Sequence, residues 1–167
     1  MDTQLLEQLY YIGELVSVIA VIGTLIYVGV QVRQNTLAVK SSTLQNISEN
    51  QLNVHGLIAA HGDLADIVFK AATGRGSDEG TDRFRFTAWM HTAVRSLENA
   101  FFQHREGALD ERTWRALCRQ YAPILRAGLN AKYWEERSFM YSEDFRNFVD
   151  DELLAAPMDE NWKVPGS

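Results

Sequence analysis

The sequence predicts an all-α fold, in which one N-terminal transmembrane helix continues into a stalk helix and a small helical bundle. Three observations predict it. Residues 15–32 form an uncharged, mostly apolar run. After this run, apolar residues recur three or four positions apart, which is the spacing of a helix face. No segment shows convincing period-two alternation of the kind that a half-buried strand requires.

These observations divide the 167 residues into six segments. We expect a short N-terminal tail (1–11), a transmembrane helix (12–32), a stalk with the first bundle helices (33–72), a loop (73–81), a helical bundle (82–156) and an irregular tail (157–167). A chain of this length accommodates one domain plus an anchor.

The uncharged run is long enough to cross a bilayer. Its eighteen residues cover roughly 27 Å as a helix, against about 30 Å for the hydrocarbon core. A secretory signal peptide is disfavoured, because no basic residue precedes the run and no small-residue cleavage site follows it. A buried helix of a soluble protein is also disfavoured, because the rest of the chain is too small to surround it.

Charge predicts the orientation of this helix. Residues 1–32 contain no Lys or Arg, so all sixteen basic residues lie at or after Arg33. The positive-inside bias therefore places the N-terminus outside and the C-terminal domain in the cytoplasm. The 135 residues after Val32 carry nineteen acids against sixteen bases, and this balance disfavours a nucleic-acid partner, which would require a basic face.

The span and its cytoplasmic end carry candidate residues for helix–helix contacts. The small residues are Gly13, Ser17, Ala20, Gly23, Thr24 and Gly29, followed by the side-chain amides of Gln31, Gln34 and Asn35. Pairs of small residues four positions apart let membrane helices approach closely, and amides can hydrogen-bond between chains. Two alternatives stay open, because small residues are common in membrane helices in general and because headgroups and water can solvate the amides.

The stalk and the following helices are read from apolar spacing. A sparse heptad at Val30, Leu37 and Leu44, continued by Ile47 and Val54, favours a stalk that packs on its own domain over an autonomous coiled coil. A break is expected near Gly62. The sequence TGRGSDEGTD, residues 73–82, has no apolar residue and predicts a loop.

Three further helix signals follow the loop. A helix over about 82–105 has an apolar stripe of Phe86, Met90, Val94, Leu97 and Phe101. Asp110 and Ser142 are each expected to cap the start of a helix. Pro123 is expected to kink or end the helix that begins after Asp110, because proline lacks the amide donor.

The polar residues do not form a recognisable catalytic or metal-binding pattern. His55 and His61 do not share a helix face, whereas His91 and Glu98 share a face but lie two turns apart. Neither pair matches the spacing of a di-iron bundle or a zinc protease. Cys118, the single cysteine, falls on an apolar stripe and is expected to pack as a small hydrophobe. We therefore predict neither an enzyme nor a bound cofactor.

Two stretches carry a resemblance to a known family. They are IGELVSVIAVIGTLIYVGVQVRQNT (12–36) and FFQHREGALDERTWRAL (101–117), with YWEERSFMYSEDFRNFVDDEL (133–153) downstream. The chain resembles a large family of small bacterial proteins of unknown function that have one N-terminal span and a helical cytoplasmic domain. The resemblance implies a single-pass architecture and no activity. Together with the predicted span, it leads us to expect the protein in the bacterial inner membrane.

The second stretch contains a polar block, Gln103, His104 and Arg105, between two apolar helices. If these side chains turn inward, they form a polar junction that fixes how the helices meet. If they turn outward, they form a partner-binding corner.

Two functions follow as hypotheses. The first is a membrane-anchored interaction protein that associates with itself or serves as an accessory subunit of a larger membrane complex. The alternative is a membrane-tethered sensor whose bundle holds a small apolar ligand among Trp89, Phe101, Phe102 and Trp114.

Overall fold

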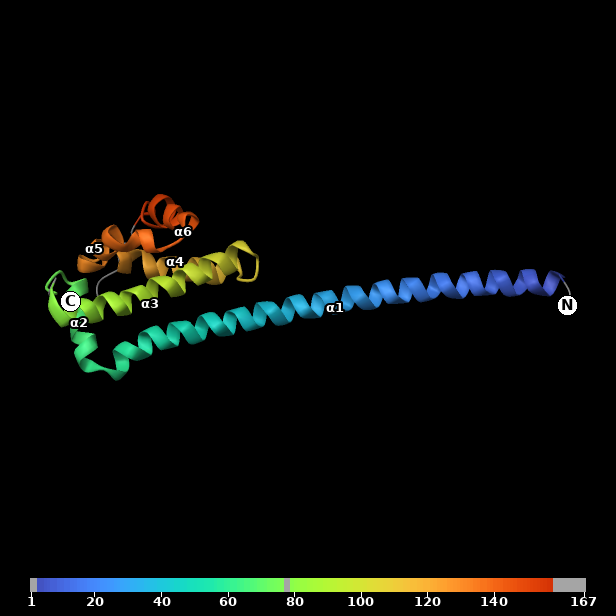
Figure 1. Ribbon diagram of the computed structural model, residues 1–167, viewed down its shortest axis with the longest axis horizontal. Helices are drawn as coiled ribbons and strands as arrows, with labels where there is room; N and C mark the ends of the chain where they lie inside the picture. The colour runs from blue at the N-terminus through green and yellow to red at the C-terminus, as the bar shows by residue number, and fades with distance from the viewer. Residues whose placement is uncertain (1–2, 77–78, 158–167) are drawn as a thin grey trace. The chain divides into compact units, whose positions relative to one another are not determined.

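The predicted all-α class is confirmed. The computed structural model describes residues 3–76 and 79–157, and every regular element among them is helical (Figure 1). The elements are α1 (Thr3–Ala60), α2 (Gly62–Ala72), α3 (Gly80–Arg105), α4 (Glu111–Arg126), α5 (Gly128–Arg137), the 3₁₀ turn η1 (Ser138–Met140), α6 (Glu143–Phe148) and the π turn η2 (Val149–Leu153). The irregular tail predicted for 157–167 lies outside the described residues, except for Pro157.

The chain forms two compact units, Met1–Ser42 and Thr43–Ser167. The first unit contains the N-terminal part of α1, and the helix already begins at Thr3, within the segment expected to be a tail. An eighteen-residue window of this helix has a mean hydropathy of 2.3, and none of its side chains is buried. This helix is therefore long and apolar enough to cross a membrane.

The second unit begins with the C-terminal part of α1. Ile47 and Val54 are 4% and 3% exposed and belong to the core of this unit. The stalk therefore packs on its own domain at these two positions of the sparse heptad. The prediction is wrong for the other three, because Val30, Leu37 and Leu44 are 50%, 60% and 45% exposed. The helix ends at Ala60 because His61 adopts an extended conformation, and α2 begins at Gly62, where a break was expected.

Helix α3 supplies the centre of the core. Its predicted stripe of Phe86, Met90, Val94, Leu97 and Phe101 is buried along its whole length. The core around this stripe also includes Ile67 of α2, Leu117 of α4, Tyr133 of α5 and Phe145 of α6. The buried stripe confirms the sequence prediction for this helix.

The two predicted caps have different outcomes. The Asp110 carboxylate accepts a 3.1 Å hydrogen bond from the Thr113 N–H and caps α4 as expected. The bonds from Thr113 hold the pKa of Asp110 below its usual value. Ser142 precedes α6, but its hydroxyl makes no cap bond. The prediction for its side chain is wrong, and the contact that fixes Ser142 is the bond from its backbone N–H to Glu98 of α3.

Helix α4 passes through Pro123 and ends three residues later, at Arg126. Helix α5 then starts at Gly128, and the apolar spacing of the sequence did not predict this element. Gly128 has φ +47°, and a Cβ at this position would lie 2.2 Å from the Ala71 carbonyl oxygen. A glycine is required here because α5 begins in direct contact with the backbone at the end of α2.

Candidate functional site

The residues predicted to make helix–helix contacts divide into two groups by their angle around the axis of α1. At 100° per residue, Gly13, Ser17, Ala20, Thr24, Gln31 and Asn35 fall within an arc of about 60°. Gly23 lies about 90° from the centre of this arc, and Gly29 lies about 150° from it. These two glycines, also predicted as contact residues, therefore cannot face the same neighbouring helix as the other six. We call the six residues of the arc the small-polar face. Gln34 lies about 70° from the centre, outside this arc.

The hydroxyls on the small-polar face are bonded within their own helix. Ser17 Oγ donates to the Gly13 carbonyl at 2.8 Å, and Thr24 Oγ1 donates to the Ala20 carbonyl at the same distance. A hydroxyl bonded in this way can enter a hydrocarbon environment without an unsatisfied donor. The Gln31 amide likewise donates to the Tyr27 hydroxyl at 2.8 Å. The face therefore offers close backbone approach more than free hydrogen-bond donors.

The polar block at the end of α3 makes contacts within its own unit. His104 stacks on Trp114 with ring centroids 5.2 Å apart, and its Nε2 lies 3.3 Å from the Glu111 carboxylate. Arg105 pairs with Asp144. The Gln103 side-chain Oε1 accepts a 3.5 Å hydrogen bond from Thr43 Oγ1, and its backbone carbonyl accepts hydrogen bonds from the N–H groups of residues 108 and 109. These contacts favour the junction over the partner-binding corner, although the Arg105 side chain remains half exposed.

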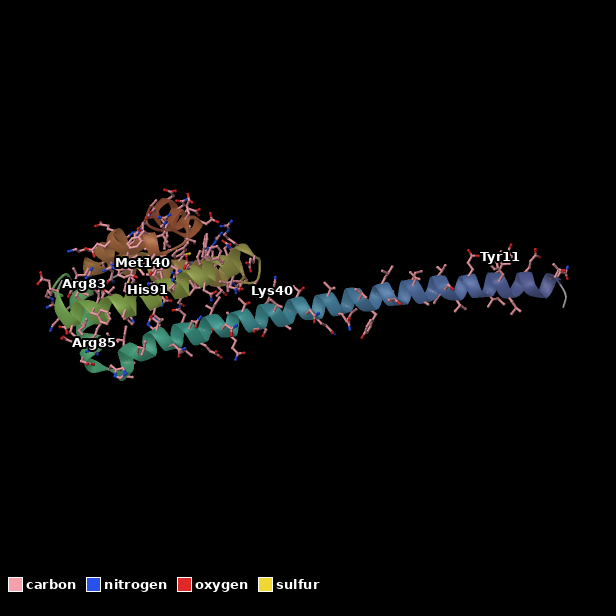
Figure 2. All side chains as sticks on the ribbon, in the orientation of Figure 1. Tyr11, Lys40, Arg83, Arg85, His91 and Met140 are labelled. Carbon is pink, nitrogen blue, oxygen red and sulfur yellow. The ribbon has the colours of Figure 1, made fainter. Side chains whose placement is uncertain are left out.

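A second polar cluster joins α3 to the C-terminal segment, and no sequence pattern predicted it. The hydroxyls of Tyr133 and Tyr141 lie 2.7 Å apart, and His91 Nδ1 lies 3.3 and 3.2 Å from them. Figure 2 labels His91 on α3 and Met140 at the end of η1. Burial raises the pKa of both tyrosines. Both phenols are therefore protonated at neutral pH, so neither serves as a base.

Glu98 extends this cluster along α3. Its side chain is buried, its Oε1 accepts a 2.8 Å hydrogen bond from the Ser142 N–H, and its Oε2 pairs with Arg95. The Arg95 guanidinium also donates to the Met140 carbonyl at 2.7 Å and lies 4.9 Å from the centre of the Tyr141 ring. These contacts tie residues 140–142 to α3, so the arrangement is that of a structural anchor.

The candidate metal ligands do not converge. No group of three His, Cys, Asp or Glu side chains that could hold a metal ion occurs among the described residues. His91 and Glu98 share a face of α3, as predicted, but each contacts a different residue of the C-terminal segment. Burial raises the pKa of the Cys118 thiol to about 12, so at neutral pH this cysteine is a protonated, poorly nucleophilic side chain.

The four aromatic residues proposed as a ligand platform do not line one cavity. Phe101, Phe102 and Trp114 gather around one end of α3, with centroid separations from Phe101 of 5.3 and 6.1 Å. Trp89 lies three turns earlier and lines a different, apolar pocket of about 260 Å³ between α1, α2, α4 and α5. The pocket beside Trp114 has about 420 Å³ and is lined by charged side chains, including Arg105 and Asp144.

Comparison with known proteins found no match to this chain. No protein-family model, no curated protein and no solved structure matches the chain. The candidate sites therefore rest on the residues and contacts described above.

Proposed function

We propose that this protein is a single-pass membrane protein of the bacterial inner membrane that associates with itself through its N-terminal helix and presents the helical bundle in the cytoplasm. The small-polar face of α1 carries the proposal. It places Gly13, Ser17, Ala20 and Thr24 on one side of a helix that is otherwise covered mostly by large aliphatic residues.

The membrane location is supported by the exposure and composition of this helix. Leu15 and Leu25 are 62% and 66% exposed, and no charge occurs from Leu15 to Val32. Exposed aliphatic side chains over this length are costly in water and favourable in hydrocarbon. The proposed cytoplasmic side follows from Arg33 and Lys40, the first basic residues of the chain. The resemblance to single-pass bacterial proteins agrees with the same arrangement.

Self-association is supported by the spacing of the small residues. The positions 13, 17, 20 and 24 alternate steps of four and three, which is the seam of a left-handed helix pair. Lipid tails are as apolar as leucine, so membrane helices associate through close packing where small side chains permit it. The internally bonded hydroxyls of Ser17 and Thr24 are compatible with such a dry seam.

Light scattering of the full chain in detergent tests this proposal. We expect the wild-type protein to have the mass of a dimer or a larger oligomer. The Ala20→Leu variant places a large side chain on the seam and is expected to shift the mass toward the monomer. The matched Gly29→Leu variant adds the same side chain on the opposite side and is expected to keep the wild-type mass. A wild-type monomer, or equal masses for all three proteins, would contradict self-association through this face.

A further inference from the structure

The corner between α3 and α4 contains a histidine whose two ring nitrogens both face oxygen acceptors. His104 lies in the last turn of α3, and its Nδ1 lies 3.3 Å from the Leu109 carbonyl oxygen in the connection to α4. Its Nε2 lies 3.3 Å from the carboxylate of Glu111 in the first turn of α4. A carbonyl oxygen and a carboxylate only accept, so each contact requires a proton on the ring nitrogen. A neutral imidazole carries one such proton, whereas the imidazolium carries both.

Two further features of the corner favour the positively charged ring. The imidazole stacks on the Trp114 ring at 14°, with ring centroids 5.2 Å apart, and an aromatic face attracts a cation at this distance. His104 also belongs to the last turn of a helix of 26 residues, where the helix dipole stabilises a positive charge. The side chain is 27% exposed, so the ring exchanges protons with the solvent.

The charged groups around the ring are mostly acidic. Those that pair beside it or line the hollow of about 420 Å³ that it faces are Arg105 of α3, Glu111 and Arg115 of α4, Asp144 of α6, and Asp151 and Glu152 of η2. Four carboxylates thus accompany two guanidinium groups. An excess of negative charge favours the charged form of the imidazole.

We propose that His104 is a pH-sensitive contact that holds α3 to α4. With a proton on each ring nitrogen, it donates to both the Leu109 carbonyl and the Glu111 carboxylate. Release of one proton to water leaves one of these contacts without a donor and removes the positive charge from the face of Trp114. The charged ring has these partners only in the folded chain. The stability that it contributes is therefore present at low pH and is lost as the pH rises through the range in which histidine releases its proton. The contact is independent of the proposed self-association, because its residues all belong to the Thr43–Ser167 unit.

Tryptophan fluorescence of the full chain in detergent tests the protonation of His104, because an imidazolium in contact with an indole ring quenches its emission more strongly than a neutral imidazole does. We expect the emission of the wild type to rise between about pH 5.5 and about pH 8.5, the range in which histidine titrates. His104→Gln removes the quencher and Trp114→Phe removes the reporter, so the rise is expected to be absent from both variants. His61→Gln is the matched control, because the ring of His61 is exposed and makes no cap bond to α2, and it is expected to keep the rise.

Thermal unfolding of the wild type, His104→Gln and His61→Gln at the same two pH values tests the contact between the helices. We expect the Tm of the wild type to exceed that of His104→Gln by about 2–4 °C more at the lower pH than at the higher pH, the effect of one stabilising cation at a helix end. The difference between the wild type and His61→Gln is expected to be the same at both pH values. Absence of the fluorescence rise in the wild type, or its persistence in His104→Gln, would overturn the protonation of His104. A Tm difference between the wild type and His104→Gln that does not change with pH would overturn its role in holding α3 to α4.

Discussion

Replacing Glu98 with alanine removes the side chain that holds the C-terminal segment against α3. Glu98 is 5% exposed, and its carboxylate accepts a 2.8 Å hydrogen bond from the Ser142 N–H. It also pairs with Arg95, which in turn donates to the Met140 carbonyl. The Glu98→Ala variant therefore leaves the Ser142 N–H without its acceptor and removes the carboxylate partner of Arg95.

The size of the effect follows from the exposure of each contact. A hydrogen bond to a carboxylate contributes about 1.5–3 kcal/mol. The Arg95 side chain is 47% exposed, so solvent screening limits its ion pair to no more than about 1 kcal/mol. We expect Glu98→Ala to lower the free energy of unfolding by about 3 kcal/mol. Glu98→Gln keeps an acceptor for the Ser142 N–H and is expected to cost only about 1 kcal/mol.

Thermal unfolding of the full chain in one detergent, followed by near-ultraviolet circular dichroism, measures this difference. With about 2–4 °C per kcal/mol for a chain of this size, Tm is expected to fall by about 6–12 °C in Glu98→Ala and by about 2–4 °C in Glu98→Gln. The reasoning is refuted if the two variants are equally destabilised, because the loss would then come from charge alone. It is also refuted if Glu98→Ala unfolds within about 2 °C of the wild type.

Three further predictions concern the same unit. Burial raises the pKa of Tyr133 and Tyr141, so the stability that these tyrosines contribute is present below about pH 10 and is lost as the pH rises through their raised pKa values. Absorbance at 295 nm should show the two tyrosines ionising together with the loss of circular dichroism, and ionisation at a lower pH than unfolding would contradict this prediction. Gly128→Ala should lower Tm more than Gly74→Ala. Both glycines have positive φ, but only at Gly128 would the added Cβ lie 2.2 Å from a backbone atom, the Ala71 carbonyl oxygen. Equal decreases in Tm would contradict the claim that this close contact requires glycine. Cys118, with a thiol pKa of about 12, should react slowly with Ellman's reagent at pH 7 and rapidly after denaturation, and rapid reaction of the folded protein would contradict its burial.

The parts of the fold that local periodicity determines could be predicted from the sequence. The apolar stripe of α3 and the Asp110 cap depend on residues at most a few positions apart, so their spacing is sufficient evidence. The break near Gly62 and the loop before Gly80 are marked by glycine and by the absence of apolar residues. Helix α5 lacks such a signal, because its start depends on the contact between Gly128 and the distant Ala71 carbonyl.

The site residues show the same division. The arc of Gly13, Ser17, Ala20 and Thr24 follows from helix geometry once α1 is known to be continuous. The anchor at Glu98 could not be read from spacing, because its acceptor role depends on Ser142, forty-four positions later. The one indication of this anchor in the sequence is that Glu98, an acidic residue, lies beside the apolar stripe of α3.

Cysteine cross-linking in native membranes tests the central proposal most directly. In a Cys118→Ser background, a single cysteine is placed either on the small-polar face, as Thr24→Cys, or on the opposite side, as Ile22→Cys. Oxidation of the membranes is expected to give a disulfide-linked dimer with Thr24→Cys and monomer with Ile22→Cys. Recovery of the protein in the soluble fraction, or equal cross-linking at the two positions, would contradict a membrane-embedded helix that pairs through this face.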